Sequence, residues 1–307
     1  MILVFGAGQL GHELETAAQQ SGIAAVRTGR DVDIADERAV GGAIERVKPD
    51  FVVNAAAYTA VDRAETEPEL AHRSNAVGPA VIADACARAG IALVHISTDY
   101  VFDGTRADGA YAEHDAVNPL GVYGRTKLDG ERAVQARLDQ HLILRTAWVF
   151  GVYGRNFLKT IMARASEQPK LRVVADQHGS PTATADLAEA ILRLRAPALS
   201  GDARWGTYHF AGSGETTWHG FASRIVAERN RLTGANTVIE AIASSEYPTA
   251  ARRPLGAPLD SSLFTRTFGF TARHWTHATD ATVAALLAVD GNRRKVAPDD
   301  RKIAADV

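Results

Sequence analysis

Short apolar segments alternate with helical segments through the first 150 residues, and this rhythm limits the fold more than any other feature of the chain. The apolar segments, typical of buried strands, are Ile2–Phe5, Ala24–Val26, Phe51–Asn54, Ala92–Ile96 and Leu142–Leu144. The helical segments are Gly11–Gln20, Glu37–Val47, Glu69–Ala89 and Leu120–Gln135. Strands that alternate with helices are joined by right-handed crossovers. The sequence therefore predicts a doubly wound, Rossmann-type parallel sheet of the α/β class.

Beyond residue 150 the alternation loosens, which predicts a second, smaller unit. Helical patterns lie at residues 155–167, 183–195, 218–228 and 280–289, a strand pattern at 171–176, and a return to the main sheet at Tyr208–Ala211. We expect residues 1–150 to form the Rossmann-type domain, with returns near 171–211. Residues 151–307 then form mainly a smaller C-terminal α/β domain that binds the substrate. The charged, aperiodic segment 292–307 predicts a flexible tail.

Composition describes an ordinary globular protein, with 46% hydrophobic and 23% charged residues. A net charge of −2 gives no electrostatic reason to expect nucleic acid or an anionic membrane as a partner. The one cysteine, Cys86, cannot form an internal disulfide, which is typical of a reducing compartment. The chain opens directly on MILVF without a basic leader, and its apolar runs are shorter than a membrane span. We therefore expect a cytoplasmic protein.

The segment FGAGQLG, which follows the first strand and opens a helix, carries Gly6, Gly8 and Gly11 in a G-x-G-x-x-G pattern. The first glycine permits a tight turn, the second lets the backbone approach a pyrophosphate, and the third lets helix and strand pack closely. Amide groups and the helix dipole then face the phosphates. We predict a dinucleotide site that includes Gln9 and Leu10.

The end of the second strand indicates which dinucleotide binds. Sites specific for NAD place an acidic residue there, on the ribose 2′-hydroxyl. Here the chain has Arg27 and, nearby, Arg30, so a 2′-phosphate would meet cations. Asp31 keeps NAD open as an alternative. We predict NADPH, with NADH tolerated, and expect Asp33 and Ile34 to flank the adenine.

The segment VYGRTKLDGE places Tyr123 and Lys127 four residues apart, on one helix face. A tyrosine with a pKa near ~10 is a poor acid–base catalyst until a nearby ammonium group favours the tyrosinate. Lys127 can do this and can also hold the nicotinamide ribose. A carbonyl that accepts hydride needs a second hydrogen bond on its oxygen, which Thr98 in HISTDYVFDG can donate. Ser97 is the rival for that role and is expected to pack beneath the site.

Several of these motifs together resemble one family. FGAGQLG, NAAAYTAVDRAE, HISTDYVFDG, NPLGVYGRTKLDGE, LRTAWVFG, GRNFLKTI and DQHGSPT are similar to the dTDP-4-dehydrorhamnose reductase family of the extended short-chain dehydrogenase/reductases. The likeness runs from residue 1 to about residue 288. It implies NADPH-dependent reduction of the 4-keto group of dTDP-4-dehydro-β-L-rhamnose to dTDP-L-rhamnose, a step of nucleotide-sugar and cell-surface polysaccharide biosynthesis.

The resemblance also implies roles for particular residues. Thr98, Tyr123 and Lys127 match the catalytic triad of the family. The residues that match the turn beside the cofactor are Ala55, Ala56, Ala57 and Tyr58, and those that match the substrate pocket are Tyr100, Trp148 and Asn156. For Trp148, core packing is the alternative.

The sequence departs from the family at three places. The glycine loop is one residue shorter than the usual G-x-x-G-x-x-G, and Gly256 and Ala257 stand where the family has Asn and Ser. Some members bridge two subunits with magnesium through glutamates, but only Glu13 fits, and Ala185 falls where another would be. We therefore predict no metal ligands and leave dependence on Mg²⁺ open.

Three alternatives stay open. The first is another dTDP-4-keto-6-deoxyhexose reductase or an epimerase or dehydratase of the same superfamily, although dehydratases carry Asp-Glu after the threonine, where this chain has Asp99 and Tyr100. The second is a non-catalytic regulatory subunit that binds a dinucleotide. The third is a 6-deoxytalose product, which differs from rhamnose only in the carbonyl face that receives hydride. The oligomeric state, including a homodimer, is open as well.

Overall fold

The computed structural model describes residues 1–106 and 109–296, with side chains up to residue 289. Within them a six-stranded sheet has the order β10-β5-β4-β3-β1-β2, and each of its neighbouring pairs is parallel. Its strands are β1 (Ile2–Phe5), β2 (Ala25–Thr28), β3 (Phe51–Asn54), β4 (Ala92–Thr98), β5 (His141–Thr146) and β10 (Gly206–His209). The predicted doubly wound α/β fold is confirmed, including the return of the chain to the sheet at Tyr208.

The strand order reverses between β1 and β3, because the chain first moves outward to β2 and then crosses back. Phe5 and Asn54 are partners at the carboxyl ends of these two strands, and the Ala55 amide donates to the Phe5 carbonyl at 2.8 Å. The glycine loop after β1 and the alanine turn after β3 therefore lie side by side. In open α/β sheets this reversal is where ligands bind.

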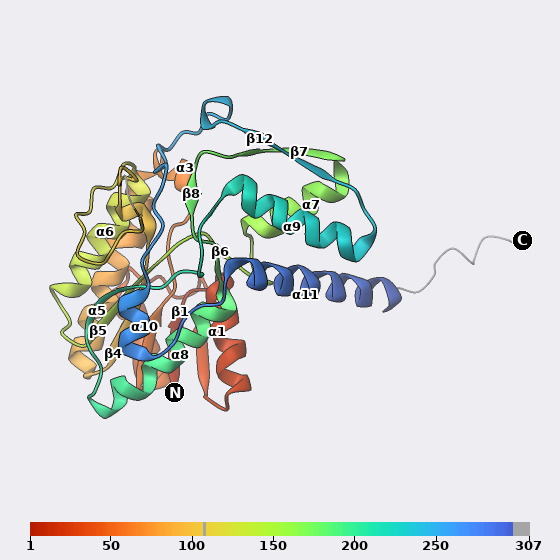
Figure 1. Ribbon diagram of the computed structural model, residues 1–307. Coiled ribbons are helices and arrows are strands. Elements are labelled where there is room, and N and C mark those ends of the chain that lie inside the picture. The colour runs from red at the N-terminus through yellow and green to blue at the C-terminus, as the bar shows by residue number, and fades with distance from the viewer. Residues whose placement is uncertain (107–108, 297–307) are drawn as a thin grey trace, which may run out of the picture.

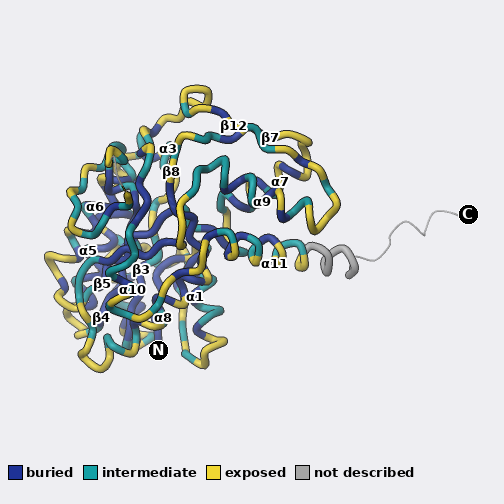
Figure 2. Tube along the Cα trace, in the orientation of Figure 1, coloured by how far each residue is buried: buried dark blue, intermediate teal, exposed yellow. Residues whose placement is uncertain are grey.

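Helices cover both faces of the sheet (Figure 1). One face packs against α1 (Gln9–Gln20) and α8 (Thr184–Ser200), the other against α2 (Glu37–Val47), α5 (Gly78–Ala89) and α6 (Val122–Gln135). The inner strands β1, β3, β4 and β5 are buried on both sides, which explains why their sequences are largely apolar (Figure 2).

A smaller lobe stands beside this domain and has its own core (Figure 1). Its elements are α7 (Phe157–Glu167), the parallel pair β7 (Lys170–Val174) and β12 (Val238–Ile242), α9 (Trp218–Thr233) and α11 (Trp275–Val296). Phe150, Leu158 and Phe221 are fully buried between them. The predicted tail 292–307 overlaps the end of α11, which continues to Val296, and residues 297–307 lie outside the described chain.

Some boundaries differ from the sequence-based expectation. The single helix predicted over Glu69–Ala89 is instead α4 (Pro68–His72), a π-helical turn η1 (Arg73–Val77) and then α5, and β4 runs two residues further than predicted. The remaining short elements are α3 (Val61–Ala64), η2 (Asp99–Val101), β6 (Val149–Phe150), β8 (His178–Gly179), β9 (Thr182–Ala183), β11 (Thr216–Thr217), η3 (Ser244–Glu246) and α10 (Ser262–Phe268). A π-helical turn leaves an insertion in the helix, and such turns are frequent at functional sites.

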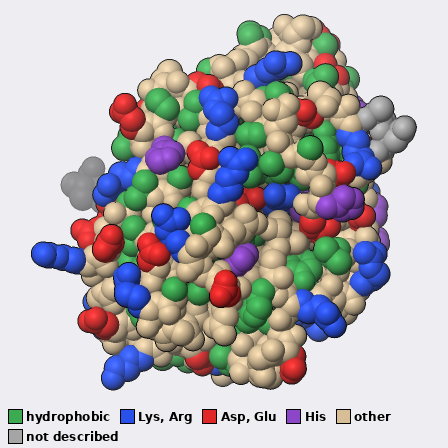
Figure 3. Space-filling model, turned by 90° about the vertical axis from the view of Figure 1, so that its left-hand side faces the viewer, with side chains coloured by type: hydrophobic (Ala, Val, Ile, Leu, Met, Phe, Trp, Pro, Cys, Tyr) green, Lys and Arg blue, Asp and Glu red, His purple; other side chains and the backbone are tan. Residues whose placement is uncertain are grey.

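The surface carries charges of both signs. On the face in Figure 3, Lys and Arg side chains are interspersed with Asp and Glu side chains. Among the described residues, no helix combines the length and apolar character that crossing a bilayer requires.

Candidate active site

The glycine loop has the geometry that its spacing predicts. Gly6 has φ +130°, and a Cβ there would lie 2.7 Å from the Ala55 carbonyl carbon. A Cβ at Gly11 would lie 2.1 Å from the Gly6 carbonyl oxygen, so α1 packs directly on the turn. A Cβ at Gly8 would meet no atom of the described chain within 4 Å. Gly8 is the N-cap of α1, where no described side chain caps the helix, so its first amides stay available to an anion.

The two residues inside the loop have different surroundings. Leu10 is 7% exposed and packs in the core under the sheet. Gln9 binds the smaller lobe: its Nε2 donates to the Val149 carbonyl at 3.1 Å, and its Oε1 accepts from Asn156 Nδ2 at 3.1 Å. Asn156 also caps α7 by accepting from the Lys159 amide at 3.0 Å. The predicted substrate residue Asn156 therefore links the glycine loop to the second lobe.

The cations expected at a ribose 2′-phosphate lie near the end of β2. Arg27 Nε donates to Glu15 Oε2 at 3.2 Å, while Arg30 is exposed. Asp33 pairs with Arg73 at 2.6 Å, and the hydrogen bond from that guanidinium lowers the Asp33 pKa. Ile34, in contrast, is 9% exposed and packs in the core against α2 and α5, so its contact with an adenine ring stays a prediction.

The turn after β3 is held by a buried residue that sequence analysis missed. Ala55 and Ala56 are half-buried, Ala57 is exposed, and the Tyr58 hydroxyl donates to Glu67 at 2.5 Å. Asn75 is fully buried in the π-helical turn.

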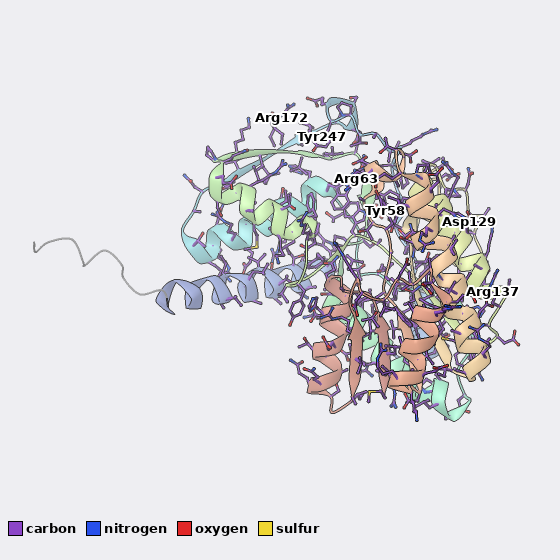
Figure 4. The ribbon with its side chains drawn as sticks, turned by 180° about the vertical axis from the view of Figure 1, so that it is seen from behind. Tyr58, Arg63, Asp129, Arg137, Arg172 and Tyr247 are labelled. Atoms are coloured by element: carbon purple, nitrogen blue, oxygen red, sulfur yellow. The ribbon has the colours of Figure 1, made fainter. Side chains whose placement is uncertain are left out.

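The Asn75 amide group bonds both the N–H and the carbonyl of Tyr58, at 2.8 and 3.1 Å, and donates to Thr126 of α6 at 3.1 Å. An asparagine inside an alanine-rich helical segment, where it is a weak helix former, was the available signal. Figure 4 places Tyr58 at the junction of the two lobes.

The structure brings Thr98 and Tyr123 together. Thr98 is the last residue of β4, and Tyr123 lies in the first turn of α6. The Thr98 hydroxyl lies near enough to the Tyr123 phenol to act against burial and lower the pKa of Tyr123. This approach requires Gly124, because a Cβ there would lie 2.2 Å from the Tyr100 carbonyl oxygen. The Tyr100 and Tyr123 rings meet edge to face at 5.5 Å.

The pKa values of Tyr123 and Lys127 differ from what the sequence predicts. Burial raises the pKa of Tyr123 to about 12, against the smaller effect of Thr98. Lys127 is 2% exposed, and its Nζ donates to the Ile96 carbonyl at 2.6 Å rather than to the phenol. Burial lowers the pKa of Lys127 to about 8. The site therefore holds Tyr123 as a neutral phenol, not as the tyrosinate that the sequence argument favoured.

A buried ion pair lies beneath the site. Ser97 Oγ donates to Glu131 Oε1 at 2.5 Å, and Arg145 binds both Glu131 oxygens, at 2.9 and 2.7 Å. Glu131 is 1% exposed. These bonds join α6 to β4 and β5, and Ser97, which is 3% exposed, is held by Glu131.

Trp148 has an unusual backbone conformation, with φ +47°. Its ring stacks on Trp218 at 3.6 Å with an interplanar angle of 7°, and a Cβ at Gly179 would lie 2.6 Å from it. A bulky residue with positive φ is strained, and such strain clusters at functional sites. Core packing and substrate contact both remain compatible with this half-buried ring.

Comparison with known proteins identifies the family. The family model described as "RmlD substrate binding domain" matches residues 1–288. A dTDP-4-dehydrorhamnose reductase of Sinorhizobium fredii is 40% identical over 284 residues, which are 91% of this chain and 95% of the relative. The chain belongs to the dTDP-4-dehydrorhamnose reductase family.

Solved structures of the same family agree. A dTDP-4-dehydrorhamnose reductase from Clostridium acetobutylicum has a TM-score of 0.86 at 37% identity, covering 93% of this chain and 99% of that one. The enzyme from Bacillus anthracis, in complex with NADP, has a TM-score of 0.85 at 32% identity, covering 92% and 98%. The resemblance deduced from the motifs is confirmed.

The fold places Ala257, where the sequence departs from the family pattern, and Glu13, where it fits that pattern. Ala257 is 1% exposed and its amide lies 3.4 Å from the His178 carbonyl, so it packs against the chain. Glu13 accepts a hydrogen bond from Thr184 Oγ1 at 2.6 Å. Within the described residues, no three His, Cys, Asp or Glu side chains gather as metal ligands would.

Proposed function

We propose that the protein catalyses the NADPH-dependent reduction of dTDP-4-dehydro-β-L-rhamnose to dTDP-L-rhamnose. The observation that carries this proposal is the proximity of Thr98, at the carboxyl end of β4, to Tyr123 in the first turn of α6, on the same sheet edge as the glycine loop. Membership of the reductase family supports the substrate class.

The residues at the site suit the cofactor. Gly8 leaves room beside the uncapped amides of α1, which is the cradle that a pyrophosphate needs. Bound NADPH would supply hydride to the carbonyl carbon of the sugar. We assign preference for the 2′-phosphate to Arg27 and Arg30, with support from the NADP complex of the Bacillus anthracis relative.

Thr98 and Tyr123 are proposed to act on the carbonyl oxygen. Both hydroxyls donate hydrogen bonds to it, which stabilises negative charge as that charge develops. Tyr123 then transfers its proton to the oxygen. A pKa of about 12 keeps the phenol protonated at neutral pH, and the phenol is still a stronger acid than the alcohol product. Lys127 fixes α6 against the Ile96 carbonyl and offers its remaining donors to the nicotinamide ribose.

We propose that the sugar lies between the lobes, against Tyr100 and Trp148. Asn156 acts there by holding α7 and Gln9 in place, since its amide group is bonded to both. We assign the reaction to the cytoplasm, because the only cysteine is buried and cannot form an internal disulfide.

Product analysis tests the function. The protein is incubated with the keto sugar and NADPH, the loss of nicotinamide absorbance is followed, and the product is identified by NMR. We expect stoichiometric oxidation of NADPH and dTDP-L-rhamnose as product. A dTDP-6-deoxytalose product would correct the stereochemistry, and tight NADPH binding without turnover would support the regulatory-subunit alternative.

A further inference from the structure

Asp99 lies next to the reacting hydroxyls but has no part in the reduction as described. It follows Thr98 directly, in the short helix η2, and is 3% exposed. Thr98 Oγ1 donates to Asp99 Oδ1 at 3.0 Å and accepts from the Tyr100 amide at 3.2 Å. The same hydroxyl lies near enough to Tyr123 to lower the pKa of that phenol.

Asp99 and the substrate carbonyl compete for the single proton of the Thr98 hydroxyl. A threonine hydroxyl has one proton to donate, and an ionised carboxylate can only accept. While Asp99 is ionised, the Thr98 proton is directed to Asp99, and Thr98 can only accept from its other neighbours. It then cannot also donate to a carbonyl oxygen. A protonated Asp99 can instead donate to Thr98 Oγ1, which frees the Thr98 proton for the substrate.

We propose that Asp99 is a positioning residue whose protonation state sets the direction of the Thr98 hydroxyl, so that reduction proceeds with Asp99 in its protonated form. This inference rests on the proposed reductase function. With Asp99 protonated, both Thr98 and Tyr123 can donate a hydrogen bond to the carbonyl oxygen. With Asp99 ionised, only Tyr123 can.

The surroundings of Asp99 favour that form. Burial raises its pKa to about 7, against smaller effects of the Thr98 hydroxyl and of backbone amides. The charge of Asp99 acts on Tyr123 from α6 and on Tyr100 from η2, and the charges of Arg253 and Asp62, which form an ion pair at 2.8 Å, also act on Tyr100. Both phenols have raised pKa values, so they keep their protons at neutral pH. Asp99 is therefore protonated below about pH 7, and the rate of reduction should fall as the pH rises through that value.

The test is the pH profile of the Asp99→Asn variant. The amide has the shape of the acid and donates to Thr98 at any pH. Between about pH 6 and about pH 8, we expect the wild-type kcat/KM to fall by about tenfold and that of Asp99→Asn to stay flat. A variant with the wild-type decline would overturn the proposal, because Lys127, with a pKa of about 8, would then account for it.

Asp129→Asn is the matched control. Asp129 lies on the outer face of α6 (Figure 4), and its side chain is 45% exposed. This variant should keep the wild-type profile. Thr98→Val provides a second variant: it removes the hydroxyl through which Asp99 acts, so its residual activity should lose the decline. Retention of the decline in Thr98→Val would also contradict the proposal.

A measurement without turnover separates this inference from the proposed function. The carbonyl stretch of a protonated carboxyl group is followed by infrared difference spectroscopy, wild type minus Asp99→Asn, across the same pH range. We expect a signal that disappears with a midpoint near neutral pH, even if the keto sugar proves not to be the substrate. Asp99 found ionised throughout the range would overturn the proposal while leaving the reductase function intact.

Discussion

At the scale of single residues, Lys127 is a buried cation whose desolvation destabilises the folded protein. Its ammonium is 2% exposed and has one backbone carbonyl as its partner, so burial displaces its pKa from 10.5 to about 8. The folded protein thus binds this proton more weakly than the unfolded chain does. Stability therefore rises with pH between about 8 and about 10.5, and the cost of the buried charge is fully present below about pH 8.

Lys127→Met should increase the stability of the protein at pH 7 and lower its turnover. The change in pKa corresponds to about 3 kcal/mol, from which the lost hydrogen bond to Ile96 takes about 1 kcal/mol. We expect Lys127→Met to be more stable than the wild type by about 1–2 kcal/mol at pH 7 in urea unfolding, and to lose this gain above about pH 10. Turnover should drop by about 100-fold or more.

Lys159→Met is a suitable control for that experiment. Lys159 Nζ also donates to a backbone carbonyl, that of Val152 at 3.0 Å, but it lies on α7. Its replacement should preserve turnover. A Lys127→Met protein that is less stable than the wild type at pH 7 would contradict the account of the buried charge.

At the scale of elements, two glycines of the β1–α1 turn differ in why a glycine is needed. Gly6 is required by the fold, because its φ is positive and a side chain would enter the Ala55 peptide group. Gly8 has ordinary backbone angles and open space around its α-carbon, so the fold alone does not require it. We propose that the close approach of the cofactor is what requires a glycine at position 8.

A pair of alanine variants tests this distinction. Gly6→Ala should lower the free energy of unfolding by about 2 kcal/mol or more through strain and contact with Ala55. Gly8→Ala should lower it by no more than about 1 kcal/mol but weaken NADPH binding by about tenfold or more. Thermal unfolding and calorimetric titration measure the two effects. Wild-type NADPH affinity in Gly8→Ala would show that the cofactor does not lie over this turn.

At the scale of the whole molecule, the parallel sheet was predictable because its inner strands are buried on both faces and are therefore apolar. The edge strand β2 and the interrupted helix over residues 68–89 were placed less well. The π-helical turn there is stabilised by Asn75, which bonds Tyr58 and Thr126 from distant parts of the chain. Local patterns carry no information about such contacts.

In the candidate site, too, local sequence patterns predicted some features, while others depend on contacts between distant parts of the chain. The spacing of Tyr123 and Lys127 placed them on one helix face, and the motif order placed Thr98 at a strand end. Lys127, however, donates to the Ile96 carbonyl. This contact depends on how α6 packs against β4, which the local sequence does not show. The sign of the Tyr123 pKa shift also depends on burial by both elements, which no single motif encodes.

The central claim is that the Tyr123 phenol donates the proton in the reduction of the keto sugar, and Tyr123→Phe tests it most directly. The substitution keeps the ring that packs against Tyr100 and removes only the hydroxyl. In stopped-flow measurements with NADPH and dTDP-4-dehydro-β-L-rhamnose, we predict that the rate of NADPH oxidation falls by about 100- to 10,000-fold, while NADPH affinity and the melting temperature stay at wild-type values. Oxidation within tenfold of the wild-type rate would contradict the account.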